Sequence, residues 1–196
     1  ESDMAPSFNH DLVPLMRQLR RLSQEDLSRS ANITQGHLSK IENGLTVPSE
    51  DVVSKIAAAL EVPRGFFSQN DRIFGLPLSL HPMYRKKASV GQHALDYINA
   101  ELNIRIIHFR RLIKAVNITK RLPFPQYDIQ DYDDDPSKIA EMVRRSWLLP
   151  RGPIRNLTES VEQAGCVVVW CHFQQTPIYG ISYRIPDLPP FIFLNT

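Results

Sequence analysis

The sequence has little of what marks several protein classes. Its 196 residues include only two cysteines, so a disulfide framework is excluded and a reducing, cytoplasmic location is expected. No apolar run approaches the roughly 20 residues that a membrane-spanning helix needs, so no membrane partner is expected. The net charge is only +2, so overall basicity does not indicate a nucleic-acid partner. With 42% hydrophobic and 22% charged residues, the composition is that of an ordinary globular protein.

The charge is unevenly distributed along the chain. Residues 1–70 carry a net charge of −2, residues 71–127 carry +7 and residues 128–196 carry −3, which indicates three parts of different character. The division that we predict is a disordered leader at 1–8, a helical domain at 9–70, a helical connector at 71–134 and an incomplete domain at 135–196.

Short amphipathic helices are predicted in the first part. Leucine and methionine recur at helical spacing over residues 12–19, and Ser23, Thr34 and Ser49 each stand where a side-chain oxygen caps a helix. Asn43-Gly44 ends the helix that Thr34 begins, because both residues tolerate a left-handed backbone. Pro63 opens a fifth, short turn that buries Phe66 and Phe67.

The rest of the chain changes from helices to strands. An apolar stripe predicts one long helix over about 91–116, and an acidic stretch at 131–135 is interpreted as a solvated linker. The further elements that we predict are helices at 136–148 and 153–163, and strands at 166–173, 179–183 and 191–194. The predicted fold class is mainly α: a five-helix N-terminal domain, a long connecting helix and a partial α+β domain.

The strongest motif lies between Gln24 and Asn43. Two short helices are joined by residues 31–34, the geometry with which a helix-turn-helix projects its second helix into the major groove of DNA. Ile33, Leu38 and Ile41 would face inward. The outward residues of the second helix are then Gln35, Gly36, His37, Ser39 and Lys40. Glutamine pairs with adenine through two hydrogen bonds, and lysine contacts guanine or phosphate.

These residues resemble the Xre family of helix-turn-helix regulators, which includes the lambda-repressor-like and Cro domains. The resemblance covers about Leu12 to Phe67, and its most specific piece is Leu38-Ser39-Lys40-Ile41-Glu42-Asn43-Gly44. It implies that Gln24 holds a phosphate and that a homodimer binds a palindromic operator in double-stranded DNA. It also implies that Thr34, Gln35, Gly36 and Lys40 face the DNA. The full set of predicted DNA-binding residues is Gln24, Thr34, Gln35, Gly36, His37, Ser39, Lys40 and Asn43. Arg17, Arg20, Arg21, Arg29 and Lys40 are expected to line one basic face.

From Asp135 onward the chain resembles the start of the ImmA/IrrE family of zinc peptidases. Residues 136–150, 152–157 and 161–165 carry the resemblance, and 180–182 and 190–195 match the strands that follow. The family binds zinc through His-Glu-x-x-His, which this sequence lacks, so we expect the zinc helix to follow Thr196 and this chain to be catalytically silent. No cofactor is predicted here, although a longer protein would take zinc. Cys166 and Cys171 are interpreted as buried small side chains.

The sequence therefore predicts a prokaryotic DNA-binding transcriptional regulator with no catalytic residue or metal ligand of its own. The C-terminal part would sense or process an unidentified effector or protein partner. Two alternatives stay open. One is a metallopeptidase whose catalytic part lies beyond residue 196, which leaves enzyme status undecided. The other is an antitoxin-type regulator that binds a partner toxin.

Overall fold

The computed structural model describes residues 8–76, 90–116, 119–173 and 176–196. The chain divides into two compact units, and the boundary falls between Phe109 and Arg110. The predicted leader lies outside the described residues up to position 7, but Phe8 packs against the core of the first unit. None of the helices in the described ranges is long and apolar enough to cross a bilayer.

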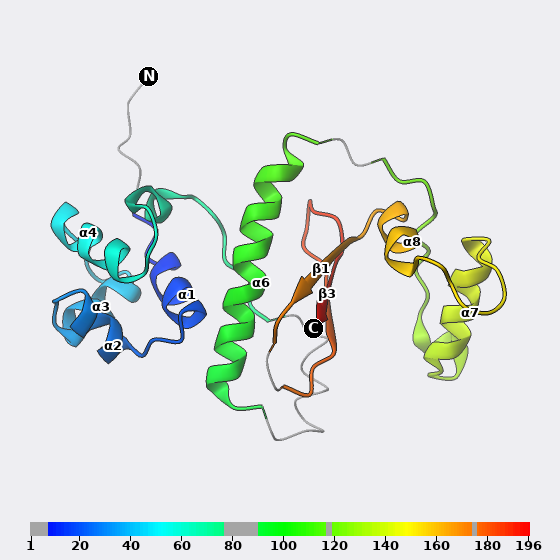
Figure 1. Ribbon diagram of the computed structural model, residues 1–196, viewed down its shortest axis with the longest axis horizontal. Helices are drawn as coiled ribbons and strands as arrows, with labels where there is room; N and C mark the ends of the chain where they lie inside the picture. Colours follow the sequence, from blue (N-terminus) through cyan, green and yellow to red (C-terminus); the bar gives the residue numbers. More distant parts are fainter. Residues whose placement is uncertain (1–7, 77–89, 117–118, 174–175) are drawn as a thin grey trace. The chain divides into compact units, whose positions relative to one another are not determined.

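The first unit contains the predicted run of short helices (Figure 1). The Ser23, Thr34 and Ser49 side chains each accept a hydrogen bond from a backbone amide in the first turn of the next helix, as the capping prediction requires. The fifth element is a single 3-10 turn after Pro63 that buries Phe67 completely. The elements are α1 (Leu12–Leu19), α2 (Gln24–Ser30), α3 (Gln35–Glu42), α4 (Glu50–Ala59) and η1 (Arg64–Ser68).

Two tight turns set the directions of α2, α3 and α4. Asn32 has a φ of 52°, so the turn between α2 and α3 uses the left-handed conformation that asparagine tolerates. Gly44 has a φ of 67° just after α3, whereas Asn43 keeps a negative φ of −88°. A side chain at Gly44 would also meet the His10 ring, whose Nε2 lies 2.9 Å from an ideal Cβ. Glycine therefore serves this turn in both conformation and space.

Helix α6 (Gln92–Ile113) is shorter than predicted at its C-terminal end. Val116 lies beyond the last helical turn and its side chain is 61% exposed, so nothing buries it to extend the helix. The predicted stripe is buried at Leu95, Ile98, Leu102 and Ile106. A second set, Ala100, Ile104 and Ile107, packs in the core of the first unit. The helix is thus buried on more of its circumference than one stripe implies.

Asn103 attaches α6 to the segment that follows η1. Its Oδ1 accepts from the Phe74 amide at 2.8 Å, and its Nδ2 donates to the Phe74 carbonyl oxygen at 2.8 Å. The side chain is only 1% exposed, so both bonds lie away from water. Asn103 therefore satisfies both backbone polar groups of Phe74, as a neighbouring β-strand would.

The second unit begins with short helices and turns. Part of the predicted acidic linker is the 3-10 helix η3 (Ile129–Tyr132), capped by Asp128. Helix α7 (Pro136–Ser146) starts after the Asp135 cap, and Leu148 beyond it has a φ of 53°. Helix α8 (Leu157–Gln163) starts four residues later than predicted, because the Asn156 side chain caps its first turn.

A three-stranded mixed sheet completes the second unit. Its strands are β1 (Val167–Cys171), β2 (Gly180–Tyr183) and β3 (Phe191–Asn195), in the spatial order β1-β3-β2. Strand β3 is parallel to β1 and antiparallel to β2, with Val169 opposite Phe193 and Phe193 opposite Ile181. One face buries the side chains of Val167, Cys171, Ile181, Tyr183, Phe191 and Phe193. Each predicted strand overlaps an observed one. The predicted ranges exceed β1 by three residues and β2 by one, and they end one residue before the end of β3.

Removing the Asn103 amide tests this attachment of α6. We expect Asn103→Ala to lower the free energy of unfolding by about 1–3 kcal/mol, because the amide and the carbonyl oxygen of Phe74 would both lose their hydrogen bonds to this side chain. Urea denaturation followed by circular dichroism measures the change. Gln92→Ala in the exposed first turn of α6 is the control, and an equal loss in both variants would contradict the role given to Asn103.

Candidate nucleic-acid interface

Helix α3 presents one continuous polar face. Leu38, Ile41 and Glu42 are its buried residues. At about 100° per residue, Gly36 and Asn43 fall opposite that buried side. The residues on the outer side are Gln35, Gly36, His37, Ser39, Lys40 and Asn43, all of them exposed or half-exposed. The structure thus brings together on one short helix every outward residue that the sequence predicted there.

A buried carboxylate lies directly behind this face. The Glu42 side chain is 5% exposed and forms an ion pair with Arg17 of α1, which is 15% exposed. Arg17 donates through Nε at 2.7 Å and Nη2 at 2.9 Å, one bond to each carboxylate oxygen. The guanidinium also donates to the Leu22 carbonyl oxygen. This two-bonded pair fixes α3 against α1.

Glu42 also sets the orientation of two glutamine amides. Gln24 donates from Nε2 to the Glu42 carboxylate at 2.7 Å, which leaves its Oε1 pointing toward α3. Gln35 then donates from Nε2 to that Oε1 at 2.7 Å. An ionised carboxylate only accepts hydrogen bonds, so the amide orientation of Gln24, and through it that of Gln35, follows from Glu42.

The relay leaves Gln35 with one N–H and its Oε1 unused. Those are the donor and acceptor that a bidentate contact with adenine N7 and N6 requires. Gln24 keeps a second N–H, which suits a phosphate oxygen. Sequence reasoning singled out both glutamines but missed Glu42. The sequence did hold a signal for it, because the helical spacing of Glu42 from Leu38 and Ile41 places this carboxylate on the buried side of α3.

The remaining predicted residues are held by local bonds. The Thr34 hydroxyl oxygen accepts from the His37 amide at 3.2 Å, and its own hydrogen stays available as a donor. Asn43 donates from Nδ2 to the Ser39 carbonyl oxygen at 2.7 Å, which leaves its Oδ1 outward. An ideal Cβ at Gly36 meets no atom within 4 Å, so no other part of the chain packs against this position of α3.

The N-terminus of α2, where Gln24 is the first helical residue, is set by a capping box. Ser23 accepts from the Asp26 amide through its hydroxyl oxygen, and the Asp26 carboxylate accepts from the Ser23 amide. Hydrogen bonds from the Ser23 hydroxyl and amide hold the pKa of Asp26 below its usual value. Asp26 is therefore ionised at neutral pH, and the start of α2 is fixed beside the glutamine relay.

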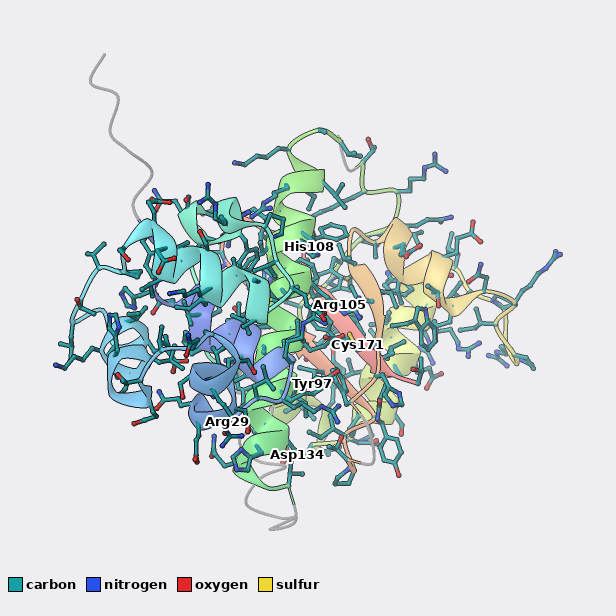
Figure 2. All side chains as sticks on the ribbon, turned by 60° about the vertical axis from the view of Figure 1, so that its left-hand side comes forward. Arg29, Tyr97, Arg105, His108, Asp134 and Cys171 are labelled. Atoms are coloured by element: carbon teal, nitrogen blue, oxygen red, sulfur yellow. The ribbon has the colours of Figure 1, made fainter. Side chains whose placement is uncertain are left out.

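The predicted basic face differs in the structure. Arg17 is taken up internally by Glu42, and Arg20 pairs with Glu61 at 3.1 Å. The Arg21 guanidinium carbon lies 4.5 Å from the ring centroid of Tyr97, which Figure 2 labels on α6. Arg29, labelled in the same view, pairs with Glu25 and Asp26. The prediction of a basic face rested on the positions of the cations in the sequence and did not include the groups that pair with them in the structure.

The two cysteines lie within and just before strand β1 of the second unit. Both are buried, Cys171 at the end of β1 (Figure 2) and Cys166 just before it, where strand alternation no longer applies. Burial raises the pKa of the Cys166 thiol, which disfavours the thiolate that zinc requires. His172 bonds the Thr196 carbonyl oxygen. Within the described ranges, no three His, Cys, Asp or Glu side chains are grouped to hold a metal.

Comparison with known proteins agrees with this geometry in the first unit. Residues 15–67 match the family model described as helix-turn-helix, which spans α1 through most of η1. This segment is therefore a helix-turn-helix domain. No curated protein matches the chain.

One solved structure, titled "SinR protein/SinI protein complex", is 18% identical over 55% of this chain and 98% of that chain, with a TM-score of 0.31. A score this low does not establish a shared fold.

Removing the Glu42 carboxylate tests its place behind α3. We expect Glu42→Ala to lower the free energy of unfolding by about 3 kcal/mol, because Arg17 would stay buried without its counter-charge. Chemical denaturation of the purified chain measures it. Glu61→Ala removes the exposed partner of Arg20 and is expected to cost less than about 1 kcal/mol. Equal costs would mean that the buried pair is no more important than a surface pair.

Proposed function

We propose that this chain is a cytoplasmic transcriptional regulator that binds DNA sequence-specifically through α3. The observation that carries the proposal is the relay from Glu42 through Gln24 to Gln35, which presents an oriented amide on the exposed face of a helix-turn-helix. Gln35 and Lys40 are the proposed base-reading residues, and Gln24 and Thr34 the proposed phosphate contacts. In the proposed complex, His37, Ser39 and Asn43 lie at the edge of the DNA major groove.

Substitution of the two glutamines separates base reading from backbone binding. We expect Gln35→Ala to weaken binding to the preferred duplex by about 10–100-fold and to change binding to a scrambled duplex little, because it removes about 1–3 kcal/mol of discrimination. Fluorescence anisotropy with both duplexes measures it, and Gln130→Ala in the second unit is the matched control. Equal losses on both duplexes for Gln35→Ala would exclude the base-reading role.

Gln24→Ala is expected to weaken binding to both duplexes, since a phosphate contact does not depend on sequence. It also removes the acceptor that orients Gln35. On the preferred duplex, the double variant should therefore lose less affinity than the two single losses combined. Strict additivity would indicate that the relay does not position Gln35 for DNA.

Gly36 gives a test in which stability and binding move in opposite directions. Gly36→Ala is expected to stabilise the fold by about 0.5–1 kcal/mol, because alanine favours a helix and the site has open space. The same methyl group would stand between α3 and the DNA and weaken binding. Thermal melting and anisotropy on one sample measure both. A stabilised variant with unchanged affinity would show that this backbone does not approach DNA closely.

A homodimer on a palindromic operator is part of the proposal. One short helix reaches only a few base pairs, and paired half-sites about one helical turn apart double the contacts. Selection of bound fragments from random DNA with the purified protein tests it. An enriched palindrome supports the dimer, and enriched single half-sites contradict it.

For the second unit we propose the first part of an ImmA/IrrE-like sensor or peptidase-like domain. The order of elements supports this: two helices, α7 and α8, precede three short strands, as the resemblance implies. The encoding reading frame beyond Thr196 provides the test. A His-Glu-x-x-His sequence there would support the assignment, and an immediate stop codon would exclude a zinc peptidase.

A further inference from the structure

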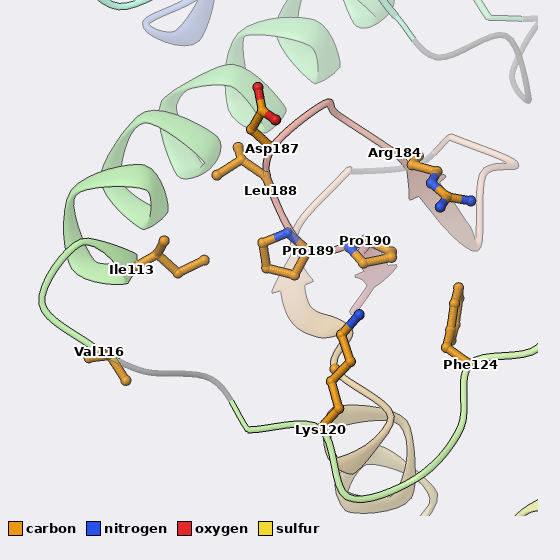
Figure 3. A pocket seen from close by; sticks show the side chains of 10 residues that line it. Ile113, Val116, Lys120, Phe124, Arg184, Asp187, Leu188, Pro189 and Pro190 are labelled. Atoms are coloured by element: carbon orange, nitrogen blue, oxygen red, sulfur yellow. The ribbon is translucent and has the colours of Figure 1, made fainter.

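A pocket of about 370 Å³ is lined entirely by residues of the second unit (Figure 3). Its volume is within the range of small-molecule sites in proteins. Most of the wall is apolar and comes from Ile113, Val116, Phe124, Leu188, Pro189 and Pro190. Two cations, Lys120 and Arg184, complete the lining with Gly165 and one carboxylate, Asp187.

The backbone holds Lys120 at the pocket. The amides of Arg121 and Leu122 both donate to the Gln163 carbonyl oxygen, at 2.8 and 3.0 Å, which ties this segment to the end of α8. The Lys120 stem then crosses Gly165, where an ideal Cβ would lie 2.7 Å from Cγ and 2.8 Å from Cε. The absence of a side chain at Gly165, which has a φ of 87°, therefore gives Lys120 its path.

A neutral group holds Arg184. With the Gln126 amide oriented to satisfy its donors and acceptors, its oxygen accepts from Nη1 at 3.0 Å and Nη2 at 3.1 Å of Arg184. A neutral partner fixes the guanidinium without cancelling its charge.

Both cations keep their charge available to a ligand. Across the described residues, no carboxylate lies within ion-pair distance of Lys120 or Arg184. The Asp187 carboxylate points away from both side chains in Figure 3. Two exposed cations that line one pocket without a carboxylate partner can bind an anion from solution through charge-assisted hydrogen bonds.

We propose that this pocket binds a small organic carboxylate with an apolar body. The anion would lie between Lys120 and Arg184, and the apolar body against the Phe124 ring and the Pro189-Pro190 wall. The volume lies near the lower end of the range for small-molecule sites, which favours a compact ligand. This binding site is independent of the DNA-binding proposal and is tested without DNA.

The probe is 4-phenylbutyrate, which matches this size, titrated into the full chain and followed by isothermal titration calorimetry and amide chemical shifts. We expect a dissociation constant of about 1 mM or below. The neutral isostere 4-phenylbutanamide should bind at least about tenfold more weakly, since it lacks charge-assisted hydrogen bonds. Inorganic phosphate should also bind more weakly, since it gains nothing from the apolar wall.

Lys120→Ala and Arg184→Ala should each reduce carboxylate affinity to about that of the amide. Both side chains are exposed, so the variants should remain folded, and the circular dichroism spectrum checks this. Lys138→Ala and Arg155→Ala remove exposed cations of the same unit outside the pocket and should bind the probe as the unaltered chain does.

Shift changes confined to the lining residues, together with these losses, would support the site. Four results would overturn it. The first is no detectable binding of 4-phenylbutyrate at a concentration tenfold above about 1 mM. The others are equal affinity for the amide, equal affinity for inorganic phosphate, or equal losses of affinity in the control variants.

Discussion

The candidate interface on the first unit depends on one buried carboxylate. Glu42 satisfies the Arg17 guanidinium, and the same oxygens accept from Gln24. Because an ionised carboxylate cannot donate, every hydrogen bond outward from it has a fixed direction. The buried carboxylate thus orders side chains at the surface of α3. The entropy cost of ordering Gln35 falls on folding and not on the binding of a ligand.

The pairing of cations lowers the positive charge that the helix-turn-helix can offer to DNA phosphates. All four arginines expected on the basic face have partners, which are Glu42, Glu61, the Tyr97 ring, and Glu25 with Asp26. Non-specific DNA affinity rises with the number of phosphates neutralised. With these cations paired, the proposed DNA contact would rest more on hydrogen bonds to base edges, for which the oriented amide is suited.

Local signals in the sequence predicted the helices of the first unit well. Ser23, Thr34 and Ser49 are capping residues whose chemistry acts within four residues, and so they fixed helix starts that the structure reproduces. The outward residues of α3 followed from helical periodicity in the same way. The predicted domain boundaries, homodimer and ImmA/IrrE-like assignment are not tested by the fold and stay predictions.

What the sequence did not predict depends on contacts between distant residues. The Arg17–Glu42 pair spans 25 positions and the Asn103 clamp on Phe74 spans 29, distances over which periodicity carries no information. The start of α8 and the end of α6 also differed, because element boundaries are set by caps and burial that propensity resolves poorly. The pocket likewise joins residues from 113 to 190.

The strand order of the second unit has a consequence for how the chain is made. Strand β3 lies between β1 and β2 but follows both in sequence. During synthesis, neither earlier strand has its hydrogen-bond partner until residues 191–195 leave the ribosome. The first unit can fold while it is being translated, whereas the sheet has to wait, with Val167, Ile181 and Tyr183 exposed in the meantime.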